Sequence, residues 1–225
     1  MDIAILAATE REMQPVEKAI GERLHSLRHH GFRYLVTGVG LMHSTHTMTR
    51  AFTAHRPDLA IQVGIAGAFD TKVHAPGSTV AVHAETLGDV GASETDGTWK
   101  DLFDLGLEDS DAPPYRSKRL ANPHARLLEL TGLLLASGVT VNRVSADSAD
   151  IDRIKAAYAP DVESMEGAAL HFVCLQEGIP FVQLRGISNR VGDREKRNWR
   201  IDEAMTRLQE SLANLLLRLN EKGTP

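Results

Sequence analysis

The sequence has only one cysteine, no long apolar run and no excess of positive charge. Cys174 has no partner for an internal disulfide, and its apolar neighbours in the sequence favour a small core residue over a nucleophile. Because 25 Lys and Arg face 30 Asp and Glu, the formal net charge is −5, and the basic surface of a nucleic-acid-binding protein is not expected. No segment approaches the roughly 18 apolar residues that cross a membrane, and the first residues do not resemble a signal peptide. These absences predict a cytoplasmic protein that binds neither nucleic acid nor membrane.

Motifs for cofactors are also missing. The segment Gly38-Val39-Gly40 lacks the third glycine of the dinucleotide signature Gly-x-Gly-x-x-Gly, because position 43 is His. His43 and His46 share one face of a predicted helix, but no third ligand stands at a spacing typical of a metal site. The sequence therefore predicts no cofactor and no metal.

The sequence does contain a regular alternation of apolar strand segments and helical segments. Hydrophobic residues (42%) and charged residues (24%) occur in ordinary proportions, and 225 residues suit one α/β domain better than two. Strands are predicted over 2–7, 32–36, 59–63, 78–86, 139–145, 162–166 and 180–188, and helices over 10–20, 43–55, 123–137, 151–158, 167–178 and from 201 onwards. The predicted fold class is α/β: a single three-layer α/β/α domain over 1–225, with a mixed central β-sheet flanked by helices.

The segment 87–119 does not follow this alternation. It is polar, rich in Gly, Asp and Pro, and carries Trp99, Phe103 and Tyr115. A connection of this length in a compact domain usually has a role of its own. Two interpretations are open: a lid over the site, or a contact between subunits.

Polar candidates follow several strands at their carboxyl ends, where open α/β sheets bind ligands. They are, in chain order, Glu12, residues 65–67 of the small-residue loop 64–69, residues 145–147, residues 163–166 and the segment 185–189. Structural alternatives exist, since acidic residues are favoured in a first helical turn and Thr9 is suited to cap the first helix. For Glu166 taken alone, capping its own helix and a functional role are equally supported. The convergence of several such loops at one edge of the sheet favours a ligand site.

Three of these segments together resemble the purine nucleoside phosphorylase and nucleosidase superfamily. They are Gly64-Ile65-Ala66-Gly67, Met165-Glu166-Gly167-Ala168-Ala169 and Arg185-Gly186-Ile187-Ser188-Asn189. Within this superfamily the chain is most similar to the futalosine hydrolases, nucleosidases of an alternative menaquinone pathway, through segments in 35–40, 63–69, 85–105 and 187–199. The resemblance implies a nucleosidase that uses water to release hypoxanthine from its small-molecule substrate futalosine, and a homodimer or higher homo-oligomer.

The resemblance also implies roles for individual residues. Glu166 would accept hydrogen bonds from the ribose hydroxyls, Met165 would pack on the sugar, and Glu12 would activate water. Adenine-releasing relatives have Asp at position 189, whereas Asn189 offers both a donor and an acceptor and points to a 6-oxopurine as the leaving base. The other expected substrate-binding residues are Ile65, Ala66, Gly67 and Glu163, then Arg185 and Ser188, which would orient Asn189, and finally Arg194 with Trp199, which together with Arg190 would meet the carboxylate on the 5′ side of futalosine.

Other functions are not excluded by these motifs. Ile65 stands where relatives have serine, and the aromatic residue that stacks on adenine is replaced near Ala149. A 5′-methylthioadenosine/S-adenosylhomocysteine nucleosidase is the first alternative, although Asn189 argues against it. A phosphorylase would need phosphate, for which no set of arginines is evident. A catalytically silent purine-binding protein is a further alternative, and the pair Glu12 and Glu166 argues against that one.

Overall fold

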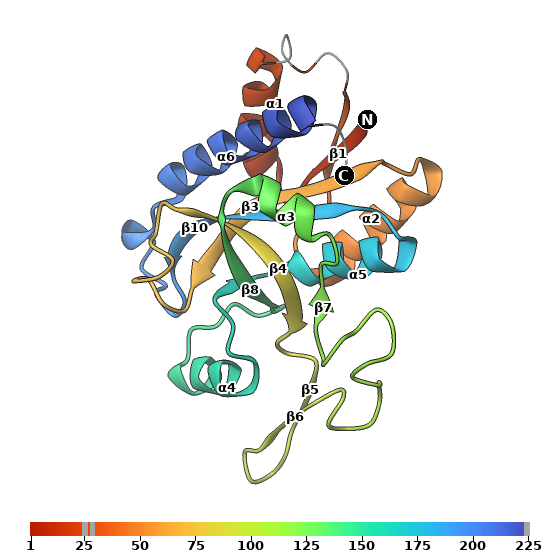
Figure 1. Cartoon of the computed structure of the whole chain (residues 1–225). Coiled ribbons are helices and arrows are strands. Elements are labelled where there is room, and N and C mark those ends of the chain that lie inside the picture. The colour runs from red at the N-terminus through yellow and green to blue at the C-terminus, as the bar shows by residue number, and fades with distance from the viewer. Residues whose placement is uncertain (24–26, 28–29, 223–225) are drawn as a thin grey trace.

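The computed structural model describes residues 1–23, 27 and 30–222. In this part of the chain, eight strands form one mixed sheet, and helices cover both of its faces (Figure 1). The predicted fold class is therefore confirmed. The strands of the sheet are β1 (Asp2–Ala7), β2 (Gly31–Val36), β3 (Leu59–Ala68), β4 (Thr79–Leu87), β7 (Leu120–Ala121), β8 (Leu134–Thr140), β9 (Val162–Ser164) and β10 (Phe181–Arg190).

Six α-helices are described between and after these strands. They are α1 (Glu10–Arg23), α2 (Leu41–Ala54), α3 (Ala125–Thr131), α4 (Ser148–Tyr158), α5 (Gly167–Glu177) and α6 (Ile201–Lys222), and a short 3₁₀ helix, η2 (Lys196–Asn198), precedes the last one. The sequence of β1 explains how the layers form, because successive side chains of a strand point to opposite faces. Ile3 and Ile5 pack in one core with α1, α3 and α6, whereas Ala4 and Leu6 pack in a second core with α2 and α5.

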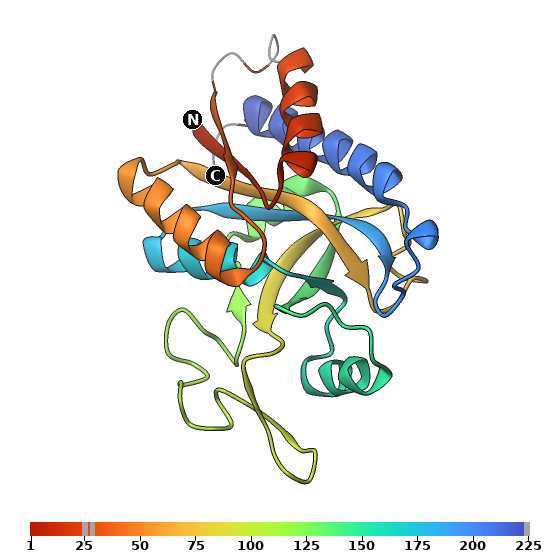
Figure 2. The ribbon, with the colours of Figure 1, turned by 180° about the vertical axis from the view of Figure 1, so that it is seen from behind.

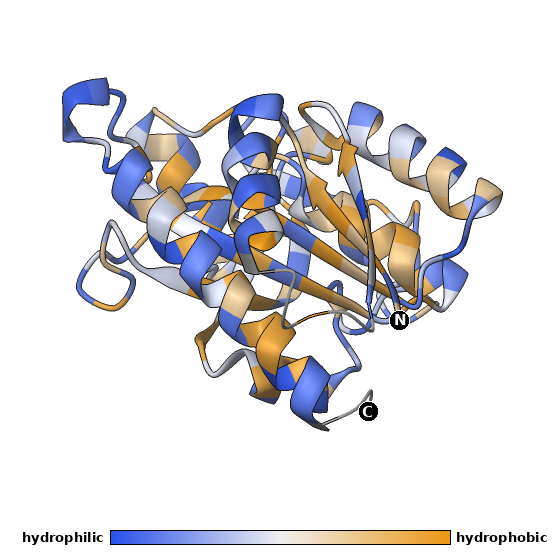
Figure 3. Cartoon of the chain, turned by 90° about the horizontal axis from the view of Figure 1, so that it is seen from above, coloured by the Kyte–Doolittle hydropathy of each residue, from blue (hydrophilic) through white to orange (hydrophobic). Residues whose placement is uncertain are grey.

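The views from behind and from above agree with this layering. Figure 2 shows α1 and α6 on one side of the sheet and α2 and α5 on the other. In Figure 3 the strands are largely apolar and the outward surfaces of the helices are largely polar. No described helix has both the length and the apolar character needed to cross a bilayer.

Five strands of the sheet close into a ring. β3 pairs with β10 in parallel, β10 with β4 antiparallel, β4 with β8 in parallel, β8 with β9 in parallel, and β9 with β3 antiparallel. β1 and β2 extend the sheet outward from β3. The register of β10 against β3 shifts by one residue between Ile187 and Asn189, which leaves Ser188 as the extra residue of a β-bulge. The ring brings β3, β9 and the end of β10 to one place.

Two predicted elements are wrong. The segment Gly64 to Ala68 is not a loop but the second half of β3, paired with both β10 and β9. The helix predicted over 123–137 ends at Thr131, because Gly132 adopts the left-handed conformation (φ 65°) and β8 begins at Leu134. Gly138 accordingly lies within β8 and is not the end of a helix.

The segment 87–119 extends from the body of the protein (Figure 1). It contains a small hairpin, β5 (Gly91–Ser93) with β6 (Trp99–Asp101). It contacts the rest of the chain at several places. Trp99 Nε1 donates to the Tyr158 hydroxyl at 2.8 Å, and Arg119 Nη2 donates to the Tyr158 carbonyl at 3.0 Å. Asp89 accepts from the Asn142 N–H, and Tyr115 packs with Leu120 and Ala168.

Candidate active site

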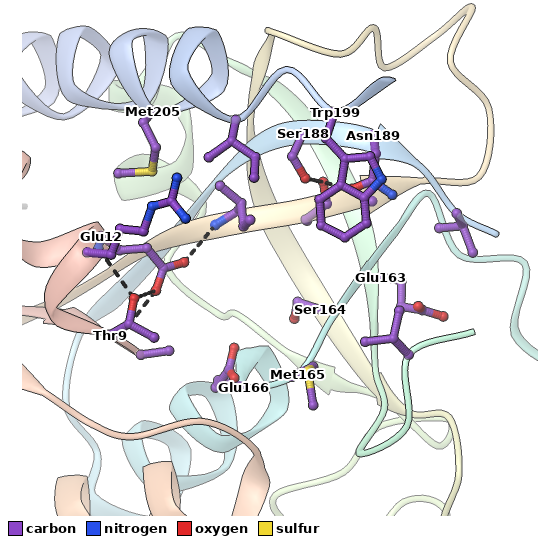
Figure 4. Close-up of a pocket in the computed structure, with 18 of the residues that line it drawn as sticks. Thr9, Glu12, Glu163, Ser164, Met165, Glu166, Ser188, Asn189, Trp199 and Met205 are labelled. Atoms are coloured by element: carbon purple, nitrogen blue, oxygen red, sulfur yellow. Dashed lines mark hydrogen bonds between the residues drawn. The ribbon is translucent and has the colours of Figure 1, made fainter. Parts of the chain in front are cut away.

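A pocket of about 630 Å³ opens where β3, β9 and β10 end and α1, α5 and α6 begin (Figure 4). No residue of 87–119 lines it, so within the described chain that segment is not a lid over this pocket. Eleven of the thirteen residues predicted from the sequence line it, and Arg185 and Arg190 do not. The lining residues are Glu12, Ile65, Ala66, Gly67, Glu163, Met165, Glu166, Ser188, Asn189, Arg194 and Trp199.

Glu166 lies at the junction of β9 and α5, and it does not cap its own helix. It occupies the N-cap position of α5 but makes no side-chain cap hydrogen bond. Its Oε1 instead accepts from the backbone N–H of Gly40 at 3.0 Å. Gly40 has a positive φ of 84°, a conformation that glycine adopts readily. The capping alternative is therefore excluded, and the carboxylate is held by a loop from across the pocket.

The surroundings of Glu166 affect its protonation. The residue is only 6% exposed, and burial raises the pKa above the ordinary value of a glutamate. The Arg185 guanidinium, 4.0 Å away, and the Gly40 N–H counteract this effect, while the negative charge of Glu12 adds to it. Glu12 and Glu166 are thus electrostatically coupled within one pocket.

Glu12 helps to begin α1 and also lines the pocket. Thr9 and Glu12 form a capping box at the start of α1: Glu12 Oε2 accepts from the Thr9 backbone N–H at 3.1 Å and from the Thr9 hydroxyl at 2.8 Å, and Glu12 N–H donates to Thr9 Oγ1 at 3.3 Å. Glu12 Oε1 accepts from the Ile65 backbone N–H at 3.2 Å. The predicted cap at Thr9 is confirmed, and the same contacts fix the Glu12 carboxylate against β3 in the pocket wall.

Ser188 and Asn189 lie at the end of β10. Ser188 Oγ donates to Asn189 Oδ1 at 2.7 Å, and Asn189 Nδ2 donates to the Arg190 carbonyl at 2.7 Å. With its oxygen engaged, the amide has one further N–H to offer. Ser188 orients Asn189 in the way that was predicted from the sequence.

Arg185 lies behind the pocket wall. The residue is buried (1% exposed), with Nε donating to Gln183 Oε1 and Nη2 donating to Gln62 Oε1, both at 2.8 Å. The prediction that Arg185 touches substrate and orients Asn189 is therefore wrong, because strand alternation turns this side chain into the interior of the ring. Arg185 faces Glu166 instead.

Glu163 supplies a second buried carboxylate to the pocket lining. Its Oε1 accepts from the Ser145 N–H at 3.0 Å, and its Oε2 has no hydrogen-bond partner among the described residues. Burial raises the pKa of Glu163, and the negative charge of Asp89 adds to this effect, whereas hydrogen bonding with Ser145 and the positive charge of Arg194 oppose it. A buried acceptor without a partner is costly, so a donor on a bound molecule would be favoured there.

Strand β3 gives the order of these groups along the pocket. Ile65 bonds to Glu12, and Gly67 pairs with Asn189 on one side and Glu163 on the other. At about 3.3 Å per residue, the two positions are roughly 7 Å apart. Figure 4 shows Glu12 and Met205 at one end, Trp199 and Asn189 at the other, and Glu166 below them.

The two ends carry different cations. Arg194 stacks over Trp199 (5.3 Å from Cζ to the ring centroid) and acts electrostatically on Glu163, so it belongs to the Asn189 end. Arg11, next to Glu12 in the first turn of α1, also lines the pocket and forms no ion pair or hydrogen bond with another described residue. Sequence reasoning missed Arg11, because a charged residue in an exposed helical turn is ordinary. The described residues contain no cluster of three potential metal ligands.

The comparisons with known proteins agree with this geometry. The sequence profile of the phosphorylase superfamily matches residues 2–221. The chain belongs to the phosphorylase superfamily. It is 30% identical to futalosine hydrolase from Thermus thermophilus, over 83% of this chain and 81% of that protein, and 32% identical to futalosine hydrolase from Acidothermus cellulolyticus, over 80% and 73%.

Other members of the superfamily are less similar in sequence. A 5′-methylthioadenosine/S-adenosylhomocysteine nucleosidase from Chromohalobacter salexigens is 26% identical over 82% of this chain and 79% of that protein. Among solved structures, the nucleosidase of the same name from Colwellia psychrerythraea, in complex with adenine, has a TM-score of 0.79 at 19% identity and covers 97% of this chain and 96% of its own. That likeness concerns the fold.

Proposed function

We propose that this protein is a futalosine hydrolase, which cleaves the N-glycosidic bond of futalosine with water and releases hypoxanthine in menaquinone biosynthesis. The observation that supports this proposal most is one pocket that brings together Glu12, Glu166 and an asparagine, Asn189. The relatives that are at least 30% identical over most of their length support the substrate. The reaction class, hydrolysis of an N-glycosyl bond, also fits the more distant nucleosidase relative.

Glu166 would bind the ribose. As the bond from C1′ to N9 breaks, positive charge develops on the sugar ring, and hydrogen bonds from the ribose 2′- and 3′-hydroxyls to a carboxylate become stronger. The Gly40 N–H occupies one side of Oε1, so the other lone pairs remain for the sugar. Met165, in the adjacent position of the lining, would pack on the ribose.

Glu12 would activate the attacking water. The water donates a proton to the Glu12 carboxylate, its oxygen bonds to C1′, and the electron pair of the broken bond leaves with the purine. Three donors from Thr9 and Ile65 hold this carboxylate in one orientation, which is the preorganisation that a general base needs.

Asn189 would stabilise the departing base. Its free amide N–H can donate to N7 or O6 of a 6-oxopurine as negative charge builds on the ring, whereas it has no acidic proton to give to adenine. The unpaired Glu163 Oε2, opposite Asn189 across Gly67, offers an acceptor to an N–H of the base. The two groups together match a base that carries both kinds of hydrogen-bonding atom on one edge.

The position of Asn189 also changes the expectation for the 5′ substituent. With the purine at Asn189, the far end of the pocket carries Arg11, with Pro15 and Met205 as apolar walls and Asp202 as a nearby acid. We propose that Arg11, and not Arg194, meets the carboxylate of futalosine. Arg11→Gln should then weaken futalosine binding by about tenfold or more, the effect of losing a charge-assisted hydrogen bond, and leave inosine binding unchanged. The opposite pattern, with Arg194→Gln selective against futalosine, would restore the first assignment.

The function is tested by chromatography of the products. The purified protein is offered futalosine, inosine, methylthioadenosine and S-adenosylhomocysteine, each with and without phosphate. Hypoxanthine from futalosine, independent of phosphate, is the expected result. Adenine from the thionucleosides would instead favour the methylthioadenosine/S-adenosylhomocysteine nucleosidase. Asn189→Asp should shift the preference toward adenine nucleosides; no shift would mean that this residue does not select the base.

We further infer that the chain acts as one domain, in the cytoplasm, as a homodimer or higher homo-oligomer. The protruding segment 87–119, which includes the half-exposed to exposed Leu105 and Leu107, suits a contact between subunits. Light scattering of the purified protein measures the subunit count, and deletion of the β5–β6 hairpin should lower it if this segment forms the contact.

A further inference from the structure

A further carboxylate, Glu85, lies behind the pocket and has no part in the mechanism above. It stands in β4, is 1% exposed and does not line the pocket. A fully buried carboxylate without a role would cost stability, because burial removes its hydration. Its contacts form two chains of hydrogen bonds, called arms below, and both chains lead to Glu166.

The first arm runs through Gln183 and Arg185. Arg185 donates from Nε to Gln183 Oε1 at 2.8 Å, so the amide oxygen of Gln183 is turned toward the guanidinium. The amide nitrogen must then point the other way, and it donates to Glu85 Oε1 at 3.0 Å. Glu85 thereby fixes the orientation of the amide that holds Arg185, whose Nη1 is 4.0 Å from Glu166 Oε2.

The second arm runs through Thr140 at the end of β8. The backbone N–H of Ala168 donates to Thr140 Oγ1 at 2.8 Å, which leaves the hydroxyl hydrogen to donate to Glu85 Oε2 at 2.9 Å. Ala168 is in the first turn of α5, two residues after Glu166. Glu85 therefore also anchors the start of the helix that carries Glu166.

The chain makes space for this carboxylate on two sides. A Cβ added at Gly138 of β8 would stand 2.4 Å from Glu85 Oε1, and one added at Gly167 of α5 would stand 2.0 Å from it. Any larger residue at either position would displace Glu85. The absence of a side chain at Gly138 and at Gly167 therefore leaves the space that the Glu85 carboxylate occupies.

We infer that Glu85 is a positioning residue for Glu166, which it holds through Gln183 and Arg185 on one side and through Thr140 and α5 on the other. The inference rests on the proposed function in that Glu166 is taken as the ligand of the ribose. As an acceptor for both arms, ionised Glu85 balances part of the Arg185 charge and keeps the guanidinium directed at Glu166.

The protonation of Glu85 connects this network to pH. Burial raises its pKa to about 7, and the donors Gln183 and Thr140 and the charge of Arg185 limit the rise. Among the groups around Glu85, Arg185 on β10 is the charged one that acts on it, and the donors from β8 and β10 side chains are neutral. Above about pH 7 the ionised form accepts from both arms. Below it, the added proton has to point at a donor, and the hold on Glu166 weakens.

The test compares Glu85→Gln with the wild-type protein in one assay. The expected result is a kcat for futalosine hydrolysis that is lower by about tenfold above neutral pH, a KM changed by less than about twofold, and loss of the rise in kcat through about pH 7. A merely structural role would lower the melting temperature and leave the shape of the pH profile as in the wild type. An unchanged kcat and pH profile would overturn the inference.

Two further measurements keep the inference testable by itself. Thr140→Val removes the hydroxyl of the second arm without a change of charge, and this variant should also have a lower kcat. It replaces Glu85→Gln in the test if Glu85→Gln does not fold. A crystal structure of either variant is independent of any substrate, and the 3.0 Å contact of Glu166 Oε1 with Gly40 should be lost or lengthened in it. An intact contact in both variants refutes the inference, whereas a wild-type protein inactive on every nucleoside refutes the proposed function only.

Discussion

Replacing Thr9 by valine removes one hydroxyl from the pocket wall and keeps the shape of the side chain. The hydroxyl contributes a 2.8 Å charge-assisted bond to Glu12 Oε2 and a 3.3 Å cap to the Glu12 N–H. The N-cap is worth about 1 kcal/mol, and the bond to the half-exposed carboxylate about 1.5 kcal/mol at the lower end of its range. Because the Thr9 and Ile65 N–H groups still bind the carboxylate, we expect the free energy of unfolding to fall by about 1–2 kcal/mol.

Catalysis should respond more selectively than stability. In a chain of this size, 1–2 kcal/mol corresponds to a melting temperature lower by about 2–8 °C, which calorimetry detects. The less tightly held Glu12 should lower kcat by about tenfold, since a factor of ten corresponds to about 1.4 kcal/mol in the barrier. Thr9→Ser, which keeps the hydroxyl, is the matched control. If the valine and serine variants share one kcat while only the valine variant melts earlier, Thr9 caps α1 and does not orient a catalytic base.

Two more predictions concern stability. Gly167→Ala places a methyl group 2.0 Å from Glu85 Oε1, and this overpacking should lower the free energy of unfolding by about 1–3 kcal/mol. The measurement is the melting temperature, which should fall. An unchanged melting temperature would mean that Glu85 can move away from the added methyl group without cost. His171 is fully buried, its Nδ1–H donates to the Leu120 carbonyl at 2.7 Å, and burial lowers its pKa to about 3. Since the unfolded chain binds this proton near pH 6.5, the stability from neutral His171 is complete above about pH 6.5 and is lost as the pH falls toward about 3. At about pH 5 this loss of stability is about 2 kcal/mol. The His171→Phe variant should not show it when the melting temperatures of the two proteins are compared at pH 7 and at about pH 5. An equal fall in melting temperature in both proteins would contradict the lowered pKa of His171.

The parts of the fold that follow a local rule could be predicted. β1 is given by a continuous apolar run and α6 by 3.6-residue spacing, and the cap at Thr9 follows from its side chain and the acid three residues later. The ring of five strands could not be predicted, because it depends on the pairing of β3 with β10, whose residues are more than one hundred positions apart. Periodicity carries no information about such pairing.

The wrong predictions share a cause: a residue was interpreted by its usual neighbours in sequence rather than its neighbours in space. Gly64 suggests a loop, but within β3 it is needed because a Cβ would stand 2.5 Å from the Arg185 guanidinium. Leu134 and Leu135 suggest a helix face, but they begin β8 with exposed side chains. Of the site, the residues with unusual motifs were found, whereas Arg11 and Glu85, which look like ordinary charged residues, were recognised only from their surroundings.

The β-bulge at Ser188 divides β10 into two parts with different surroundings. Before it, Gln183 and Arg185 are committed to the interior of the ring, where each contact depends on several others. After it, the register of Asn189 against β3 is shifted by one residue. Among the described residues, the side chain of Asn189 forms hydrogen bonds only with its two chain neighbours, Ser188 and Arg190. A substitution at position 189 therefore does not require repacking of the ring. If Asn189 selects the base as proposed, single mutations at this position can change the base preference, in evolution or by design, while the contacts that hold Glu166 are kept.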